Sequence, residues 1–282
     1  MRGVATGPSV ARVAHATRAR AFRAVAKGGA PKSGGAKPER LDRLLSRLGY
    51  CTRAEAKRWV GDGRVTLNGA PVKRHDAKVS PVTTGELLID GEPPDHPDGL
   101  VAMMHKPPGL VCSHDAREGP NVYDLLPARW RARNPTVEAV GRLDKDTTGL
   151  LLLTDDGELL HRLTSPKKDV PKTYELEVDA DIPEDAAQVF ASGELMLTNE
   201  TKPCAPAKLT VSRDSLRVAT LELTEGRFHQ VKRMMRSRGC EVTRLHRSAM
   251  GALTLGHLTE GEVRAIDREE LERRLVGDAQ DT

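Results

Sequence analysis

A run of four consecutive leucines at residues 150–153 constrains the fold of this chain more than any other sequence feature. Gly149 and Thr154 bound the run, so its short length favours a strand over a helix. A strand that is apolar at every position must be buried on both faces, with packed layers above and below it. The sequence therefore predicts a central, doubly covered strand, with Asp144 and Asp146 on the loop just before it.

Strands and helices are predicted to alternate irregularly around this centre. Apolar patterns predict strands over residues 86–89, 100–105, 110–113, 173–178, 209–211 and 216–223. They predict helices over residues 122–131, 157–164, 183–192 and 229–238, and a last helix from Asp267. Asp155, Asp156 and Gly157 fit a turn and N-cap for the second of these helices. The irregular order favours an α+β domain with a mixed sheet over residues 100–275, not a regular βαβ winding.

A smaller module is predicted over residues 39–80, followed by a linker over residues 81–99. Its first helix is marked by one apolar face, made of Leu41, Leu44, Leu45 and Leu48, and Gly49 ends it. Thr52 and Glu55 have the spacing of a capping box that opens a second helix. Asn68 and Gly69 then form a typical two-residue hairpin turn.

Two short helices, a hairpin and a cationic helix face resemble the S4-type RNA-binding module. On the second helix Arg53 and Lys57 are four residues apart and share a face, with Arg58 alongside. The resemblance implies that Arg43, Arg53, Lys57 and Arg58 bind RNA. An ordinary solvated helix face is the alternative explanation for these cations.

Positive charge is concentrated at the N-terminal end of the chain. Residues 1–38 contain eight Lys or Arg and no acid, and residues 39–80 contain ten bases and five acids. The remainder is acidic, although the net charge of the whole chain is +4. We expect residues 1–38 to be a disordered basic tail. Such a tail fits an arm on an RNA phosphate backbone, but also an organellar transit peptide or a simple solvated extension.

Composition excludes several other classes of protein. The four cysteines, Cys51, Cys112, Cys204 and Cys240, are scattered without the spacing of a zinc site or a disulfide framework. They suit a reducing compartment, and we expect the cytoplasm. The nine histidines have no metal-ligand spacing, so we expect no metal. No stretch reaches the roughly 18 apolar residues of a membrane span, so we expect no membrane segment.

The loop before the leucine run is the best candidate for chemistry. A carboxylate packed against a core is partly desolvated, and needs a cationic partner to stay ionised as a nucleophile. Physical reasoning alone leaves Asp144 and Asp146 open to another role, because most loop aspartates are turn residues. A two-carboxylate hydrolase is a further alternative. It is disfavoured because residues two apart on an extended chain face opposite ways.

Four segments, in order, resemble the motifs of the pseudouridine synthase family. The central one is Arg142-Leu143-Asp144 followed by Asp146-Thr147-Thr148-Gly149-Leu150. The others are the turn at residues 105–109, Lys172-Thr173-Tyr174, and residues 226–234 (GRFHQVKRM). Four motifs in the correct order are much more specific than any single one. Details such as Thr164-Ser165-Pro166 resemble the branch that acts on small-subunit rRNA.

The resemblance implies a role for each motif residue. Asp144 is the implied nucleophile, and Lys232 is the implied cation that pairs with it. Tyr174 is implied to lie against the target base; from the pattern alone it shares a strand face with Leu176 and Val178 and could be a packed core residue. Lys232 has an equally plain alternative as a surface lysine.

Further cations are implied to contact RNA. Arg142 would hold the gap left by an extruded nucleotide or contact a phosphate, with a structural ion pair as the alternative. Arg227 and Arg233 belong to a late cluster that would meet RNA phosphates, together with Arg236, Arg238, Arg244 and Arg247. The implied chemistry requires no cofactor.

The sequence therefore predicts a small S4-like domain followed by a mixed-sheet catalytic domain that isomerises a chosen uridine in ribosomal RNA. We expect a monomer whose substrate is small-subunit rRNA or a small-subunit assembly intermediate. A large-subunit rRNA synthase is one alternative. A non-catalytic rRNA-binding assembly factor is another, because fold does not fix function.

Overall fold

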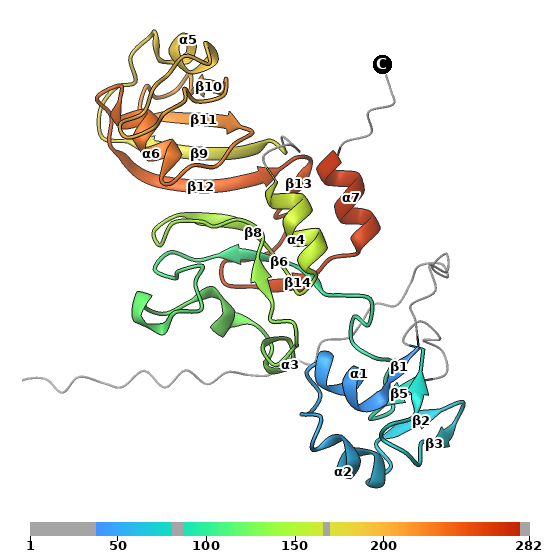
Figure 1. Ribbon diagram of the computed structural model, residues 1–282. Coiled ribbons are helices and arrows are strands. Elements are labelled where there is room, and N and C mark those ends of the chain that lie inside the picture. Colours follow the sequence, from blue (N-terminus) through green and yellow to red (C-terminus); the bar gives the residue numbers. More distant parts are fainter. Residues whose placement is uncertain (1–37, 81–86, 166–169, 277–282) are drawn as a thin grey trace, which may run out of the picture. The chain divides into compact units, whose positions relative to one another are not determined.

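A computed structural model describes residues 38–80, 87–165 and 170–276. The basic tail and the first part of the linker therefore lie outside the described residues. The predicted α+β architecture, with a small N-terminal module before a mixed sheet, is confirmed (Figure 1).

The N-terminal module is built around the predicted leucine face. Helix α1 (Leu41–Arg47) buries Leu41, Leu44 and Leu45 completely, and Gly49 ends it with a φ of 76°. Helix α2 (Ala56–Gly61) follows the predicted capping box, in which the backbone N–H of Thr52 donates to the Glu55 carboxylate and Glu55 N–H donates back to the Thr52 hydroxyl. These local patterns are confirmed because each depends only on neighbouring residues.

Five short strands complete this module. Asn68 and Gly69 both have positive φ, as the predicted hairpin between β2 (Val65–Leu67) and β3 (Ala70–Pro71) requires. Strand β5 (Leu87–Ile89) adds to the other side of β2, and β1 (Glu39–Arg40) pairs with β4 (Lys78–Val79).

The remaining strands form one nine-stranded sheet in the order β10-β11-β9-β12-β8-β6-β14, with β13 beside β12 and β7 beside β8. Only the pairing of β12 with β8 is parallel, so the sheet is mixed as predicted. The bounds are β6 Val101–Lys106, β7 Glu138–Ala139, β8 Thr148–Thr154, β9 Lys172–Val178, β10 Lys208–Val211, β11 Val218–Leu223, β12 Val242–Met250, β13 Leu253–Thr254 and β14 Val263–Ala265.

Strand β8 is buried on both faces, which confirms the interpretation of the leucine run. Leu151 and Leu153 enter one apolar cluster, and Leu150 and Leu152 enter another on the opposite face. Helices α4 (Gly157–Thr164) and α7 (Arg268–Val276) cover the second face and lie side by side (Figure 1). Helices α5 (Ala186–Ala191) and α6 (Gln230–Arg236) pack on the first face.

Several predicted elements differ in the structure. The strand expected at residues 110–113 is wrong, since only an isolated bridge joins Val111 to Asn121. The helix expected at residues 122–131 is broken, because Pro127 separates a 3₁₀ turn (Val122–Leu125) from α3 (Ala128–Arg131). A further 3₁₀ turn (Ala116–Glu118) and strands β1, β4, β7, β12, β13 and β14 were not predicted.

The two aspartates that follow β8, Asp155 and Asp156, have different structural roles. Asp156 caps α4, accepting hydrogen bonds from the backbone N–H groups of Glu158 and Leu159, as predicted. Asp155 does something else: its carboxylate is buried against Arg133 at 2.7 Å and accepts the Leu100 N–H. This ion pair is almost fully shielded from solvent, so it joins the start of β6, the end of β8 and the segment after α3.

Candidate active site

The candidate nucleophile lies on a tight turn at the start of β8. The backbone N–H of Thr147 donates to the Asp144 carbonyl at 3.1 Å, which folds residues 144–147 back on themselves. Gly149 then passes Arg247 of β12 so closely that an added Cβ would lie 2.3 Å from the Arg247 carbonyl oxygen. The turn therefore rests directly against the central strands.

A buried lysine fixes this turn by hydrogen bonds to its backbone carbonyl groups. Lys106, at the end of β6, is fully buried and donates from Nζ to three carbonyl oxygens, those of Pro107, Lys145 and Thr147, at 2.8–3.2 Å. Burial lowers the pKa of its ammonium group. The sequence motif marked Lys106 as part of an opening turn but did not indicate that its side chain anchors the Asp144 loop.

Lys232 of α6 lies between the two carboxylates of this turn. Its Nζ is 3.5 Å from Asp144 Oδ2, and 2.6 and 2.7 Å from the two oxygens of Asp146. The side chains of Lys232 and Asp144 are only 20% and 26% exposed, whereas that of Asp146 is 72% exposed. The structure thus brings Lys232 close to Asp144. The ammonium group of Lys232 lies closer still to the carboxylate of Asp146.

The expectation that Asp144 and Asp146 face opposite ways is wrong. It assumed an extended chain, but the turn closed by Thr147 carries both carboxylates to the same ammonium group. Partial burial raises the pKa of Asp146, but the hydrogen bond and charge of Lys232 outweigh it and hold this pKa below the ordinary 3.8. Asp146 is therefore a companion anion that helps to fix Lys232.

His229 completes this cluster on the side of Asp144. It precedes α6 in a left-handed conformation, with a φ of 49°, and its Nε2 lies 3.5 Å from Asp144 Oδ1. Non-glycine residues adopt this conformation rarely, and often at functional sites. Its place beside the carboxylate was not anticipated from the sequence.

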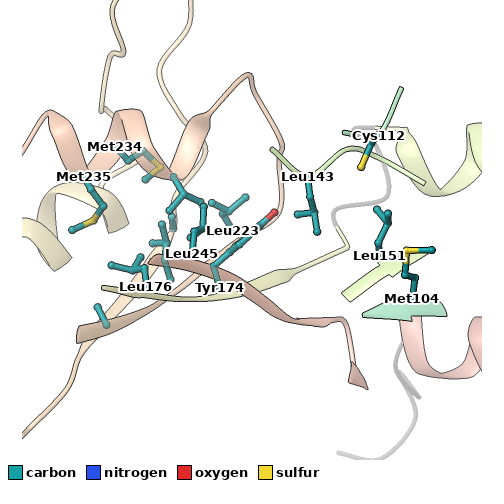
Figure 2. Packing of buried hydrophobic residues seen from close by; sticks show 14 of the residues in the cluster. Met104, Cys112, Leu143, Leu151, Tyr174, Leu176, Leu223, Met234, Met235 and Leu245 are labelled. Carbon is teal, nitrogen blue, oxygen red and sulfur yellow. The ribbon is translucent and has the colours of Figure 1, made fainter. Parts of the chain in front are cut away.

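Tyr174 lies on the core face of β9 with Leu176 and Val178, as its position in the strand predicted, and only 8% of it is exposed. Figure 2 shows its ring extending toward Leu143, the residue before Asp144. Its hydroxyl has no hydrogen-bond partner in the described parts of the chain. The ring is therefore part of the apolar cluster that includes Leu143, next to the candidate nucleophile in the chain.

The predicted RNA-contacting residues near the site fall into two groups. Arg142 is exposed, and no ion pair or hydrogen bond to another described residue occupies it. Arg227 and Arg233 are instead bound by protein acceptors, because both reach Glu200 and both donate to backbone carbonyls. Their charge shapes the loop before α6, so their contact with RNA stays a prediction.

The other late arginines do not form the free patch that was expected. Arg247 is 2% exposed and points into the core, where its Nε donates to the Leu150 carbonyl at 2.8 Å. The remaining three are paired with carboxylates: Arg236 with Glu241, Arg238 with Asp185 and Arg244 with Glu177.

The cations of the N-terminal module are more open. Arg43, Arg53 and Arg58 are 59–86% exposed and make only long ion pairs of 3.5–3.9 Å with nearby acids. Lys57 is exposed and has no ion-pair partner in the part of this module that the structure describes. Such loosely held charges remain available to a polyanion.

Residues 38–80, 87–165 and 170–276 contain no group of three His, Cys, Asp or Glu side chains placed to hold a metal ion. None of the helices in these same ranges has the length and apolar character needed to cross a bilayer. All four cysteines are unpaired thiols.

Comparison with known proteins matches both parts of the chain. Residues 101–237 match the family model described as RNA pseudouridylate synthase, and residues 39–81 match the S4 domain. The chain is 41% identical over 234 residues to an uncharacterized RNA pseudouridine synthase of Bacillus subtilis, covering 82% of this chain and 96% of that protein.

Two further likenesses agree with these matches. Ribosomal small subunit pseudouridine synthase A of Escherichia coli strain K12 is 38% identical over 236 residues, which cover 82% of this chain and 98% of that protein. A crystal structure of a pseudouridylate synthase is 35% identical, covers 84% of this chain and 100% of its own, and superposes with a TM-score of 0.57.

Proposed function

The chain belongs to the RNA pseudouridylate synthase family, and from this membership we propose that it isomerises one chosen uridine to pseudouridine in small-subunit ribosomal RNA. The observation that carries the proposal is the shielded carboxylate of Asp144, which meets Lys232 at 3.5 Å. Similarity to small-subunit synthases of Escherichia coli and Pasteurella multocida supports the choice of RNA.

The proposed reaction breaks the bond between uracil N1 and ribose C1′ and forms a bond between C5 and C1′. Asp144 attacks covalently, either at the base or at the sugar, and releases the base fragment so that it can turn. The C5 hydrogen is lost to solvent and N1 gains a proton, so no electrons are exchanged with a cofactor. The residues need only position the nucleotide and stabilise charge.

We assign the surrounding side chains by their contacts. Lys232, 3.5 Å from the Asp144 carboxylate, orients it and stabilises negative charge that passes to the uracil ring. Tyr174 offers an aromatic surface to the extruded base. Arg142, exposed beside Asp144 and without an ion pair to the described residues, contacts RNA at the gap the nucleotide leaves.

In this proposal the N-terminal module at residues 39–80 binds the RNA. Arg43, Arg53, Lys57 and Arg58 bind phosphates, since their charges are exposed and weakly paired. Residues 81–99 lead from this module, to which their strand β5 adds, to a catalytic domain at residues 100–275. We further propose a monomer that acts in the cytoplasm on rRNA or a small-subunit assembly intermediate, in keeping with its bacterial relatives.

Release of tritium from uracil C5 tests the proposal. Small-subunit and large-subunit rRNA transcripts, each labelled at C5, are incubated with the protein and with Asp144→Asn. Release from small-subunit RNA by the native protein alone supports the proposal. Release only from large-subunit RNA moves the substrate to that subunit, and tight binding of RNA without any release points to an assembly factor.

A further inference from the structure

An exposed aromatic ring stands next to the proposed nucleophile. Phe228, at the tip of the loop before α6, is 73% exposed, the largest value for a large apolar side chain among the described residues. The hydrophobic stabilisation that a buried phenylalanine side chain would provide is therefore mostly absent in the free protein. Only 3% of the residues in this chain are aromatic, so an exposed phenylalanine at this position indicates a surface that binds a partner.

The ring of Phe228 is held in a fixed orientation. It stacks on His229 with the ring centres 3.8 Å apart and the planes at 17°. His229 in turn lies 3.5 Å from the Asp144 carboxylate. The stack covers one face of Phe228 and leaves the other open, so the open face lies one stacked ring away from the nucleophile.

The loop that carries this stack is braced from behind. Gln230 Oε1 accepts the backbone N–H of Arg227 at 2.8 Å. The Arg233 guanidinium donates to the carbonyl of Phe228 itself at 3.1 Å and to Glu200 at 2.7 Å. A ring braced in this way loses little conformational freedom when it binds a flat partner.

We propose that Phe228 is a stacking platform for a base of the RNA strand next to the uridine that enters the site, and so a specificity-determining residue. The proposal rests on the proposed function, because RNA supplies the partner. Nucleic-acid bases are the flat, weakly polar groups that aromatic side chains bind by stacking. The extruded uridine must reach Asp144, which places its unstacked neighbours at the open face of Phe228.

Phe228→Ala tests the platform, with Leu216→Ala as a matched control because Leu216 is also exposed, at 57%, in a different loop. Stacking on an aromatic side chain is worth about 1–3 kcal/mol per base, so KM for labelled rRNA rises between about 5-fold and 150-fold. The value of kcat stays within about twofold. Phe228→Trp restores KM, and Leu216→Ala changes neither constant.

A binding measurement separates this proposal from the proposed function. In an Asp144→Asn background, Phe228→Ala raises Kd for the rRNA by the same factor as KM. If the native protein releases no tritium, the proposed function fails, yet a Kd that depends on Phe228 still supports the platform. An unchanged Kd, or a fall in kcat alone, overturns the platform whatever the tritium assay gives.

A fluorescent base locates the partner. 2-Aminopurine is placed in turn at the nucleotides that flank the modified uridine, and each RNA is bound to Asp144→Asn. Stacking on Phe228 quenches the probe at one flanking position, and the quenching is lost when Phe228→Ala is added. Equal fluorescence with and without Phe228 at every flanking position would rule the platform out.

Discussion

Replacing Lys232 by methionine removes the cation between two carboxylates and keeps the length of the side chain. At the observed 3.5 Å from Asp144, two unit charges attract by about 1 kcal/mol in bulk water and about 5 kcal/mol at the effective dielectric constant of a protein surface. Both side chains are only partly shielded, so the true value lies between these limits. Each 1.36 kcal/mol is tenfold in rate, which predicts a loss of kcat between about fivefold and about five-thousandfold.

RNA affinity is expected to respond far less to Lys232→Met. The ammonium group of Lys232 is already paired with the carboxylates of Asp144 and Asp146, so we expect it to contribute little to binding a phosphate. Lys57 is the converse case, since it is exposed and has no ion pair with the described residues of its module. Lys57→Met should weaken binding, reduce the slope of log Kd against log salt by about one, and leave kcat unchanged.

The two variants are compared by single-turnover tritium release and by equilibrium binding over a range of salt concentrations. Lys232→Arg serves as the charge-preserving control and should keep most of the rate. The reasoning is refuted if Lys232→Met loses rate and affinity by the same factor, or if it loses less than about threefold in rate. Either result would place Lys232 among ordinary RNA contacts.

Three further predictions concern the scaffold and its pH dependence. Gly149→Ala should lower the free energy of unfolding by about 2–5 kcal/mol, because its φ is 109° and the new methyl group would strike the backbone of Arg247. Arg133→Met should cost about 3–5 kcal/mol, since it leaves the Asp155 carboxylate buried and unpaired. Because the pKa of Asp146 is held below 3.8, its contribution to stability should be present above pH 3.8 and be lost as pH falls through the folded value; Asp146→Asn should remove that acid-side dependence.

Denaturant unfolding with matched variants checks these values. Gly157→Ala changes a glycine that has ordinary φ and no neighbour within 4 Å of the added atom, so its effect should stay below about 1 kcal/mol. Arg217→Met breaks an exposed pair with Asp181 and should also cost less than about 1 kcal/mol. Equal losses in a test variant and its control would contradict the argument from burial or strain.

Features set by neighbouring residues could be predicted from the sequence. The two-faced burial of β8, the capping box at Thr52 and the hairpin at Asn68 all follow from local patterns, and all are present. The break in the helix predicted at residues 122–131 also had a local signal, Pro127, which apolar periodicity obscured.

Features set by long-range contacts could not be predicted. Strand β12 escaped notice because two register shifts break the alternation of its buried side chains, and because Arg247 occupies a core position. The hydrogen bonds from Lys106 to the Asp144 loop span about forty residues of sequence, and nothing local marks them. The motif resemblance named Lys232 and Asp144, but the part taken by Asp146 depends on how α6 lies against the turn.

The buried ammonium group of Lys106 has a consequence for how the protein uses RNA. Because three carbonyl groups already share its hydrogens, the shape of the Asp144 turn is settled when the chain folds, not when a ligand arrives. The encounter with RNA then carries no entropic penalty for ordering this turn. Interaction energy gathered along the strand can go instead into unstacking and rotating a single nucleotide.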